Sequence, residues 1–133
     1  MIAIDTNILI RFLVKDDQKQ SELVYQRFKQ AESENEILFI PLLVVLEVIW
    51  VLQTVYEISD NDILSAIGEL LLVPVLRFEA QTVVQDFISS AYGTKFDLSD
   101  ILIAHSAHFS KCQFVLTFDK KASEFKYFDL LSH

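Results

Sequence analysis

Short apolar runs alternate with longer stretches of helical periodicity along this chain. Residues 1–4, 36–40, 73–78 and 113–118 are apolar runs of strand length. A short, uninterrupted apolar run is typical of a strand that is buried on both faces of a sheet. Because helical segments separate these runs, the pattern predicts an α/β fold in which helices cover both faces of a mainly parallel sheet.

The segments between the apolar runs show the periodicity of amphipathic helices. The clearest example places Val24, Phe28 and Ala31 on one stripe of a helix. Ser59 or Asp60 is expected to cap the start of a later helix. The expected helices cover residues 5–14, 17–35, 42–55, 59–71, 79–92, 97–109 and 119–125.

Length and composition predict one globular domain over residues 1–133. The chain has 133 residues, of which 52% are hydrophobic, and no repeat or Gly/Ser-rich linker divides it. The single Cys112 excludes an internal disulfide and favours a reducing, cytoplasmic location. No basic segment followed by an apolar one opens the chain, so no signal peptide is expected.

The most apolar segment of the chain covers residues 40–56. A spanning helix needs roughly 20 apolar residues, and this segment is shorter and contains Glu47. A buried helix and no membrane association are therefore expected.

The net charge of −8 argues against a broad basic surface for nucleic acid. It leaves open a nucleic-acid enzyme whose acidic site is neutralised by metal ions.

Four carboxylates stand where such a sheet would place a binding site. Asp5 follows the first apolar run and Asp119 follows the fourth. Glu47 and Asp100 lie in the first halves of two expected helices. Ligand sites of parallel α/β sheets lie beyond the carboxyl ends of the strands, so all four could lie near one edge.

Structural interpretations exist for the same aspartates. Asp5 and Asp119 could each cap the helix that follows. Asp97 also fits an N-cap, with Asp100 three residues later in a variant of the capping box. Asp100 shares its side of the helix with small residues such as Ala104, which allow close packing. Asp97 is therefore expected to be structural, and Asp100 is the better candidate ligand.

Glu47 and the histidines bear on which metal could bind. The neighbours of Glu47 in residues 44–50 are apolar, so a carboxylate buried there would need water, a cation or a proton. Several carboxylates without thiols suit a hard cation such as Mg²⁺ or Mn²⁺. His105 is expected in the core, His108 on another side of the same helix and His133 at the terminus, so zinc is not expected.

Four segments, in this order, resemble the PIN domain family and within it the VapC-type toxin ribonucleases of toxin–antitoxin pairs. The segments are IDTNILIRFLVKDD (4–17), the apolar helix around Glu47, FDLSDILIAHSA (96–107) and VLTFDKKA (115–122). The resemblance covers nearly the whole chain. It implies a three-layer α/β/α sandwich with a small, mainly parallel sheet of four to five strands, in which the first and fourth strands are neighbours.

The resemblance also implies a set of site residues. Asp5, Glu47, Asp100 and Asp119 would be the catalytic residues and the ligands of one or two Mg²⁺ or Mn²⁺ ions. Supporting residues would be Asp97, Thr6, Asn7 and Thr117. Arg11 and Lys120 flank these motifs and are candidate contacts to RNA phosphates.

The function implied by the resemblance is a metal-dependent endoribonuclease that hydrolyses RNA phosphodiester bonds as the toxin of a toxin–antitoxin pair. The implied partners are RNA, a small VapB-like antitoxin whose C-terminal segment occupies the site, and a second copy in a homodimer. One alternative is a PIN-family nuclease of RNA processing or DNA repair, which the short chain disfavours. Another is a catalytically silent interaction module, which has no need for four mutually repelling carboxylates.

Overall fold

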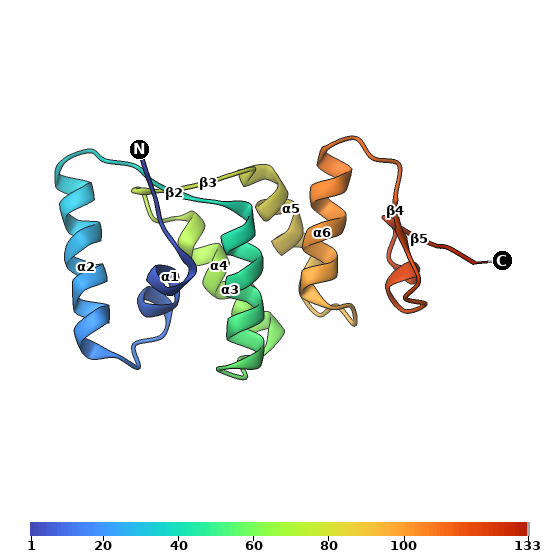
Figure 1. Cartoon of the computed structure of the whole chain (residues 1–133), viewed down its shortest axis with the longest axis horizontal. Helices are drawn as coiled ribbons and strands as arrows, with labels where there is room; N and C mark the ends of the chain where they lie inside the picture. Colours follow the sequence, from blue (N-terminus) through green and yellow to red (C-terminus); the bar gives the residue numbers. More distant parts are fainter. Residues whose placement is uncertain (133) are drawn as a thin grey trace. The chain divides into compact units, whose positions relative to one another are not determined.

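The strands of this protein pair in parallel throughout residues 1–132, which the computed structural model describes (Figure 1). His133 lies outside the described residues. One sheet has the order β1-β2-β3 and the other pairs β4 with β5. The strands are β1 (Ile2–Ala3), β2 (Leu38–Ile40), β3 (Leu76–Phe78), β4 (Val115–Thr117) and β5 (Phe128–Leu130). The predicted α/β class with small parallel sheets is therefore confirmed, although the described strands form two sheets and not one.

The chain divides into two compact units, Met1–Gln81 and a second that begins at Thr82. The first unit contains the three-stranded sheet and four helices, and the second contains the β4–β5 pair. The resemblance implies that the first and fourth strands are neighbours in one sheet. Such a pairing would link the two units, and it stays a prediction. The single domain over residues 1–133 stays a prediction as well.

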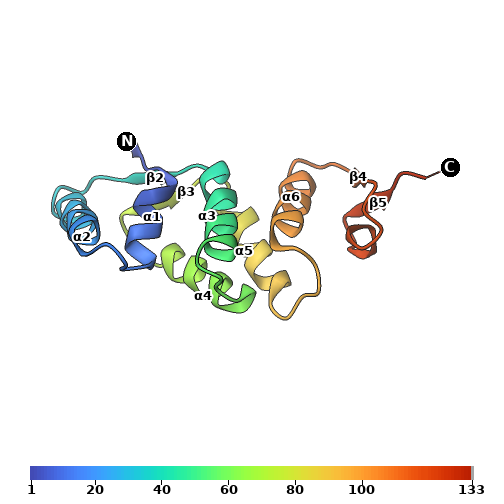
Figure 2. The same ribbon diagram turned by 60° about the horizontal axis from the view of Figure 1, so that its bottom comes forward.

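The helices of the first unit begin and end close to the predicted positions. They are α1 (Thr6–Leu13), α2 (Gln18–Ser33), α3 (Leu42–Thr54) and α4 (Asp60–Leu71). Ser59 caps α4 by accepting a hydrogen bond from the Asp62 backbone N–H at 3.3 Å. The predicted stripe of α2, which comprises Val24, Phe28 and Ala31, is buried. Figures 1 and 2 both show α1 between α2 and α3.

Helix α3 is buried on one face only, so the expectation of a buried helix is wrong for its other face. The buried residues are Val45, Val48, Ile49 and Leu52. On the opposite face, Leu43 is 78% exposed and Trp50 is 57% exposed. The spacing of these two positions from Glu47 puts all three on one side of the helix. No helix within residues 1–132 is both long enough and apolar enough to cross a membrane.

The second unit departs from the predictions in two places. It contains α5 (Gln81–Ala91), α6 (Leu98–Phe109) and the short 3₁₀ helix η1 (Ala122–Glu124). No apolar run predicts a strand after residue 118, but β5 pairs with β4. The helical period of Leu98, Ile101 and His105 predicts Phe109 on the core face of α6, but it is 57% exposed. The reason is that α6 ends at Phe109 and the chain turns at Lys111, which has a φ of 66°.

His105 of α6 is a core residue, as predicted. It is 6% exposed, and its Nε2 lies 2.7 Å from the hydroxyl oxygen of Ser90. Its ring meets the ring of Tyr127 edge to face, with 5.3 Å between the centroids. Burial lowers the pKa of His105, the positive charges of Lys126 and His108 lower it further, and Asp86 opposes them. A neutral imidazole is therefore part of the packing.

We expect the thermal stability of the protein to fall as the pH is lowered through and below the ordinary histidine range. The unfolded chain binds a proton at His105 more tightly than the folded protein does, so acidification favours unfolding. Thermal melts between pH 7.5 and pH 5 would measure this dependence. His105→Gln should remove most of it, whereas His108→Gln, at an exposed position on the same helix, should retain most of it, because burial and not His108 is the main cause of the lowered pKa of His105. An unchanged dependence in His105→Gln would contradict the assignment.

Candidate functional site

Asp5 lies at the junction between β1 and α1. The ladder continues one residue past β1, because the Ile4 N–H donates to the Phe39 carbonyl at 2.9 Å. Asp5 is the N-cap of α1, and its Oδ1 accepts a hydrogen bond from the Thr6 N–H at 2.7 Å. The side chain is exposed, and a carboxylate has acceptor positions beyond the one that this bond uses. The capping role is therefore compatible with a ligand role.

Glu47, like Asp5, accepts a hydrogen bond from Thr6. The hydroxyl of Thr6 donates a hydrogen bond to Oε1 of Glu47. Thr6 is 4% exposed, whereas Glu47 is exposed, so, of the three partners considered for this carboxylate, water is accessible to it. Asn7 follows in the first turn of α1 and is exposed. The first unit thus brings Asp5 and Glu47 together through one buried threonine.

Asp97 caps its helix, as the sequence predicts, and Asp100 lies in the first turn of that helix. Asp97 is the N-cap of α6, and its Oδ1 accepts hydrogen bonds from the N–H groups of Ser99 at 2.9 Å and Asp100 at 3.3 Å. Asp100 is half-buried, and Ala104, one turn further along α6, is fully buried. Asp100 therefore lies on the side of α6 that is closely packed.

The charge on Asp100 is disfavoured by its surroundings. Partial burial raises the pKa of Asp100, and the negative charges of Asp97 and Asp119 raise it further. Three carboxylates of the second unit therefore interact electrostatically. A divalent cation would relieve this repulsion, and their oxygen atoms are ligands that Mg²⁺ and Mn²⁺ prefer. The chemistry of these oxygen atoms suits a hard cation, but within the described residues they do not form a group of three arranged to bind one.

Asp119 stands between β4 and η1. Its backbone N–H donates to the hydroxyl oxygen of Thr117 at 3.0 Å, and its Oδ1 accepts from the Ala122 N–H at 3.2 Å. The Asp119 side chain is exposed, as is the neighbouring Lys120. Thr117 thus fixes the backbone at the end of the strand, and Asp119 begins the 3₁₀ turn.

The structure brings the predicted carboxylates together in two sets. Asp5 and Glu47 share Thr6 in the first unit, and Asp100 interacts with Asp97 and Asp119 in the second. Within residues 1–132, no group of three or more His, Cys, Asp or Glu side chains is arranged to hold a metal ion. A site made of all four predicted ligands would join the two units and stays a prediction.

Arg11, a candidate phosphate contact, is held by side chains that the sequence did not single out. Its Nε donates to Gln20 at 2.6 Å, and its Nη1 donates to Asp16 at 3.3 Å and to the hydroxyl of Tyr56 at 3.1 Å. Tyr56 in turn donates to Asp16 at 2.9 Å. An ion pair between Arg11 and Asp16 could be anticipated from their closeness in the sequence. No local sequence pattern predicts the hydrogen bond between Arg11 and Tyr56, which are 45 residues apart.

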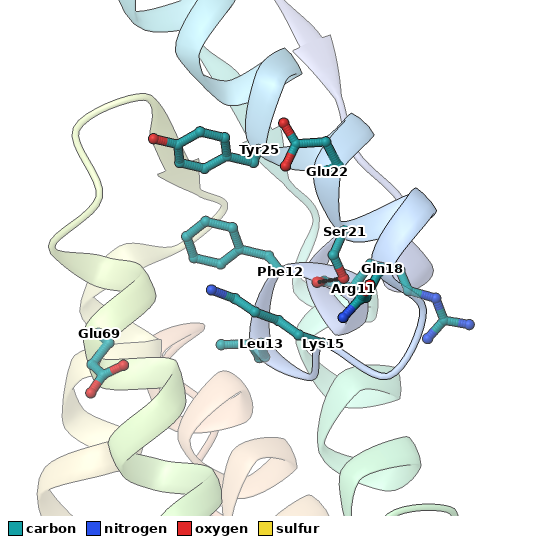
Figure 3. Close-up of a pocket in the computed structure, with 9 residues that line it drawn as sticks. All are labelled: Arg11, Phe12, Leu13, Lys15, Gln18, Ser21, Glu22, Tyr25 and Glu69. Atoms are coloured by element: carbon teal, nitrogen blue, oxygen red, sulfur yellow. Dashed lines mark hydrogen bonds between the residues drawn. The ribbon is translucent and has the colours of Figure 1, made fainter.

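A half-open cavity of about 970 Å³ lies beside Arg11 in the first unit (Figure 3). Its lining includes Phe12 of α1, Tyr25 of α2 and Glu69 of α4. Figure 3 shows the Lys15 amine turned toward the Glu69 side of the cavity and the Arg11 guanidinium turned away from it. The four predicted carboxylates are not among the residues that line this cavity.

Comparison with known proteins identifies a family. Residues 2–127 match the model of the PIN domain family. A VapC ribonuclease of Aquifex aeolicus (strain VF5) is 27% identical over 100 residues, which cover 73% of this chain and 73% of that protein. The match to the family runs through both units and contains all four predicted carboxylates.

We expect Asp100→Asn to stabilise the protein in the absence of divalent metal. The folded state binds a proton at Asp100 more tightly than the unfolded chain does, so ionisation of this carboxyl at neutral pH favours unfolding. Removing the charge should raise Tm by about 1–3 °C at pH 7 in the presence of a chelator. Asp129→Asn, at an exposed position in β5, is the matched control. A lower Tm for Asp100→Asn than for the control would contradict the prediction.

Proposed function

This chain belongs to the PIN domain family, and on that basis we propose that it is a metal-dependent endoribonuclease that hydrolyses RNA phosphodiester bonds. The observation that carries the proposal is the family match over residues 2–127, which includes each carboxylate that the sequence analysis selected. The similarity to a VapC ribonuclease supports RNA as the class of substrate.

We propose that Asp5, Glu47, Asp100 and Asp119 hold one or two Mg²⁺ or Mn²⁺ ions. When bound, such ions would activate water and stabilise the leaving oxygen of an in-line displacement at phosphorus. The support from the structure is twofold. Asp5 and Glu47 are held by one residue, and the raised pKa of Asp100 reflects its partial burial and the negative charges of Asp97 and Asp119, which a cation would offset.

The supporting residues would orient these carboxylates. Thr6 fixes one oxygen of Glu47 through its buried hydroxyl, and its N–H fixes one oxygen of Asp5. Asp97 holds the first turn of α6, from which Asp100 projects, and Thr117 holds the backbone of Asp119. Each bond leaves acceptor positions on the carboxylates. The amide of the exposed Asn7, next to Thr6, would contribute a further donor for the substrate.

The distribution of charge favours approach of the RNA strand along the second unit. Residues 1–81 carry six basic and thirteen acidic residues, whereas residues 82–133 carry five basic and six acidic residues. Phosphate groups are repelled less by the nearly neutral unit. Lys120 is exposed and directly follows Asp119, so we propose that it contacts a phosphate beside the scissile bond.

We further propose that the enzyme acts as the toxin of a toxin–antitoxin pair, as a homodimer. An antitoxin with basic side chains in its C-terminal segment would complement an acidic site and block it. A small neighbouring gene whose product co-purifies with this chain and inhibits cleavage would support this role. A chain that is encoded alone and tolerated at high expression while active on RNA in vitro would contradict it.

We expect Asp100→Asn to reduce RNA cleavage by about 100-fold or more, the range typical when one electrostatic group is removed from an active site. Cleavage of a fluorescent single-stranded RNA in the presence of Mn²⁺ would measure the loss. Because the variant is expected to be more stable than the natural chain, unfolding would not explain it. Asp129→Asn should retain full activity, and an equally active Asp100→Asn would refute the assignment.

We also expect removal of divalent metal to abolish cleavage and added metal to stabilise the fold. Neutralising the repulsion around Asp100 should raise Tm as Mg²⁺ or Mn²⁺ is titrated into the chelated protein. The rise should be smaller in Asp100→Asn, because a ligand and a repelling charge are both missing. Cleavage that persists unchanged in excess chelator would contradict metal dependence.

A further inference from the structure

Arg11 sits at the centre of a polar network at the C-terminal end of α1. Its side chain is 22% exposed, and three side chains hold it: Gln20 of α2, Asp16 of the loop before α2, and Tyr56 just after α3. The Arg11 carbonyl also accepts a hydrogen bond from the Ser21 hydroxyl at 3.0 Å. The network therefore ties the end of α1 to both neighbouring helices.

Tyr56 is the member that connects α1 to the helix of Glu47. Its hydroxyl accepts from Arg11 and donates to Asp16, so the phenol uses both of its hydrogen-bonding capacities within the network. Tyr56 lies two residues beyond Thr54, where α3 ends. Movement of the end of α1 relative to the end of α3 would break at least one of these bonds.

The same two helices are joined again at their other ends. Thr6, the first residue of α1, donates to Glu47 in the first half of α3. Thr6 and Arg11 are about 7.5 Å apart along the helix axis at 1.5 Å per residue. Two contacts at this separation restrain both the sliding and the tilting of α1 against α3, in addition to the packing between the two helices.

We propose that Arg11 and Tyr56 are positioning residues, which set the register of α1 against α3 and so hold Asp5 and Glu47 in the geometry that the reaction needs. This inference rests on the proposed function. Neither residue needs to touch RNA. Arg11 acts through α1, whose N-cap is Asp5, and Tyr56 acts through α3, which carries Glu47.

The geometry favours this role for Arg11 over a direct contact with an RNA phosphate. Asp16 already provides the negative charge beside the guanidinium, and Gln20 and Tyr56 accept two more of its hydrogen bonds. A phosphate would have to compete with these partners. The two roles also predict different kinetics, because a positioning residue affects kcat and a phosphate contact affects binding.

The test compares Arg11→Gln, Tyr56→Phe and the double variant in a cleavage assay with Mn²⁺. Both single variants should lower kcat by about 10-fold or more, since small displacements of catalytic groups cost much of the rate. KM for RNA should stay within about twofold of the natural value. Because the two residues contact each other within one network, the loss of kcat in the double variant should be smaller than the product of the two single losses. The Mn²⁺ concentration for half-maximal activity should rise in all three.

Controls separate this role from charge, folding and the proposed function itself. Lys19→Gln removes one positive charge from the exposed residue next to Gln20 and should leave kcat, KM and the Mn²⁺ requirement unchanged. Assays run well below the Tm of each variant exclude unfolding as a cause. Asp100→Asn provides the inactive reference: if it retains activity, the proposed function fails and this inference fails with it.

Three other results would overturn the inference while the proposed function stands. A raised KM and a weaker salt dependence in Arg11→Gln, with Tyr56→Phe unaffected, would make Arg11 a phosphate contact. A lower Tm with unchanged kcat in both variants would make the network purely structural. Multiplicative losses in the double variant would mean that the two residues act independently.

Discussion

The parallel pairing of β1 with β2 determines where the chemistry of the first unit can lie. Ala3 is opposite Phe39 in this ladder, so the chain leaves both strands at the same edge of the sheet. Helices α1 and α3 therefore start side by side, at Thr6 and Leu42. An antiparallel pairing would put these helix starts at opposite edges, and the hydrogen bond between Thr6 and Glu47 would be out of reach.

In the second unit, carboxylates lie close enough to Asp100 to add to the cost of its charge. In the first unit, a hydrogen bond from Thr6 stabilises the carboxylate of Glu47. Partial burial makes the charge of Asp100 unfavourable, and the negative charges of Asp97 and Asp119 add to this cost. Natural proteins tolerate such a cost mainly where a ligand or a reaction compensates for it. This is why the electrostatics of Asp100 support a cation site, even though each neighbouring aspartate also has a capping role.

Much of the fold follows from local patterns in the sequence, and the departures have physical causes. Val24, Phe28 and Ala31 predict the buried face of α2 because the helical period is a local property. Asp97 is recognisable as a cap for the same reason. Strand β5 is not recognisable, because a strand of three residues gains its stability from pairing with β4, a contact that sequence spacing does not encode.

The candidate site also combines features that local sequence predicts with features that only tertiary packing creates. The positions of Asp5 and Asp119 directly after apolar runs suffice to propose them as site residues, and the resemblance to a family adds their roles. The exposure of Glu47 was not predictable, because apolar neighbours along a helix do not reveal which face meets solvent when both faces carry large side chains. The link from Arg11 to Tyr56 spans 45 residues and arises only when α1 and α3 pack together.

The capping bonds of Asp5 and Asp119 have a consequence for which side chains these positions can accept. Each carboxylate must reach a backbone N–H of its own first turn, which a short side chain does and the longer glutamate does poorly. Glu47 lies inside a helix, has no N–H to cap, and spans the gap to Thr6 with its extra methylene. Alanine substitution at either aspartate would thus remove a helix cap and a proposed metal ligand at once. Asparagine keeps the cap and removes the charge, so it is the substitution that separates folding from chemistry.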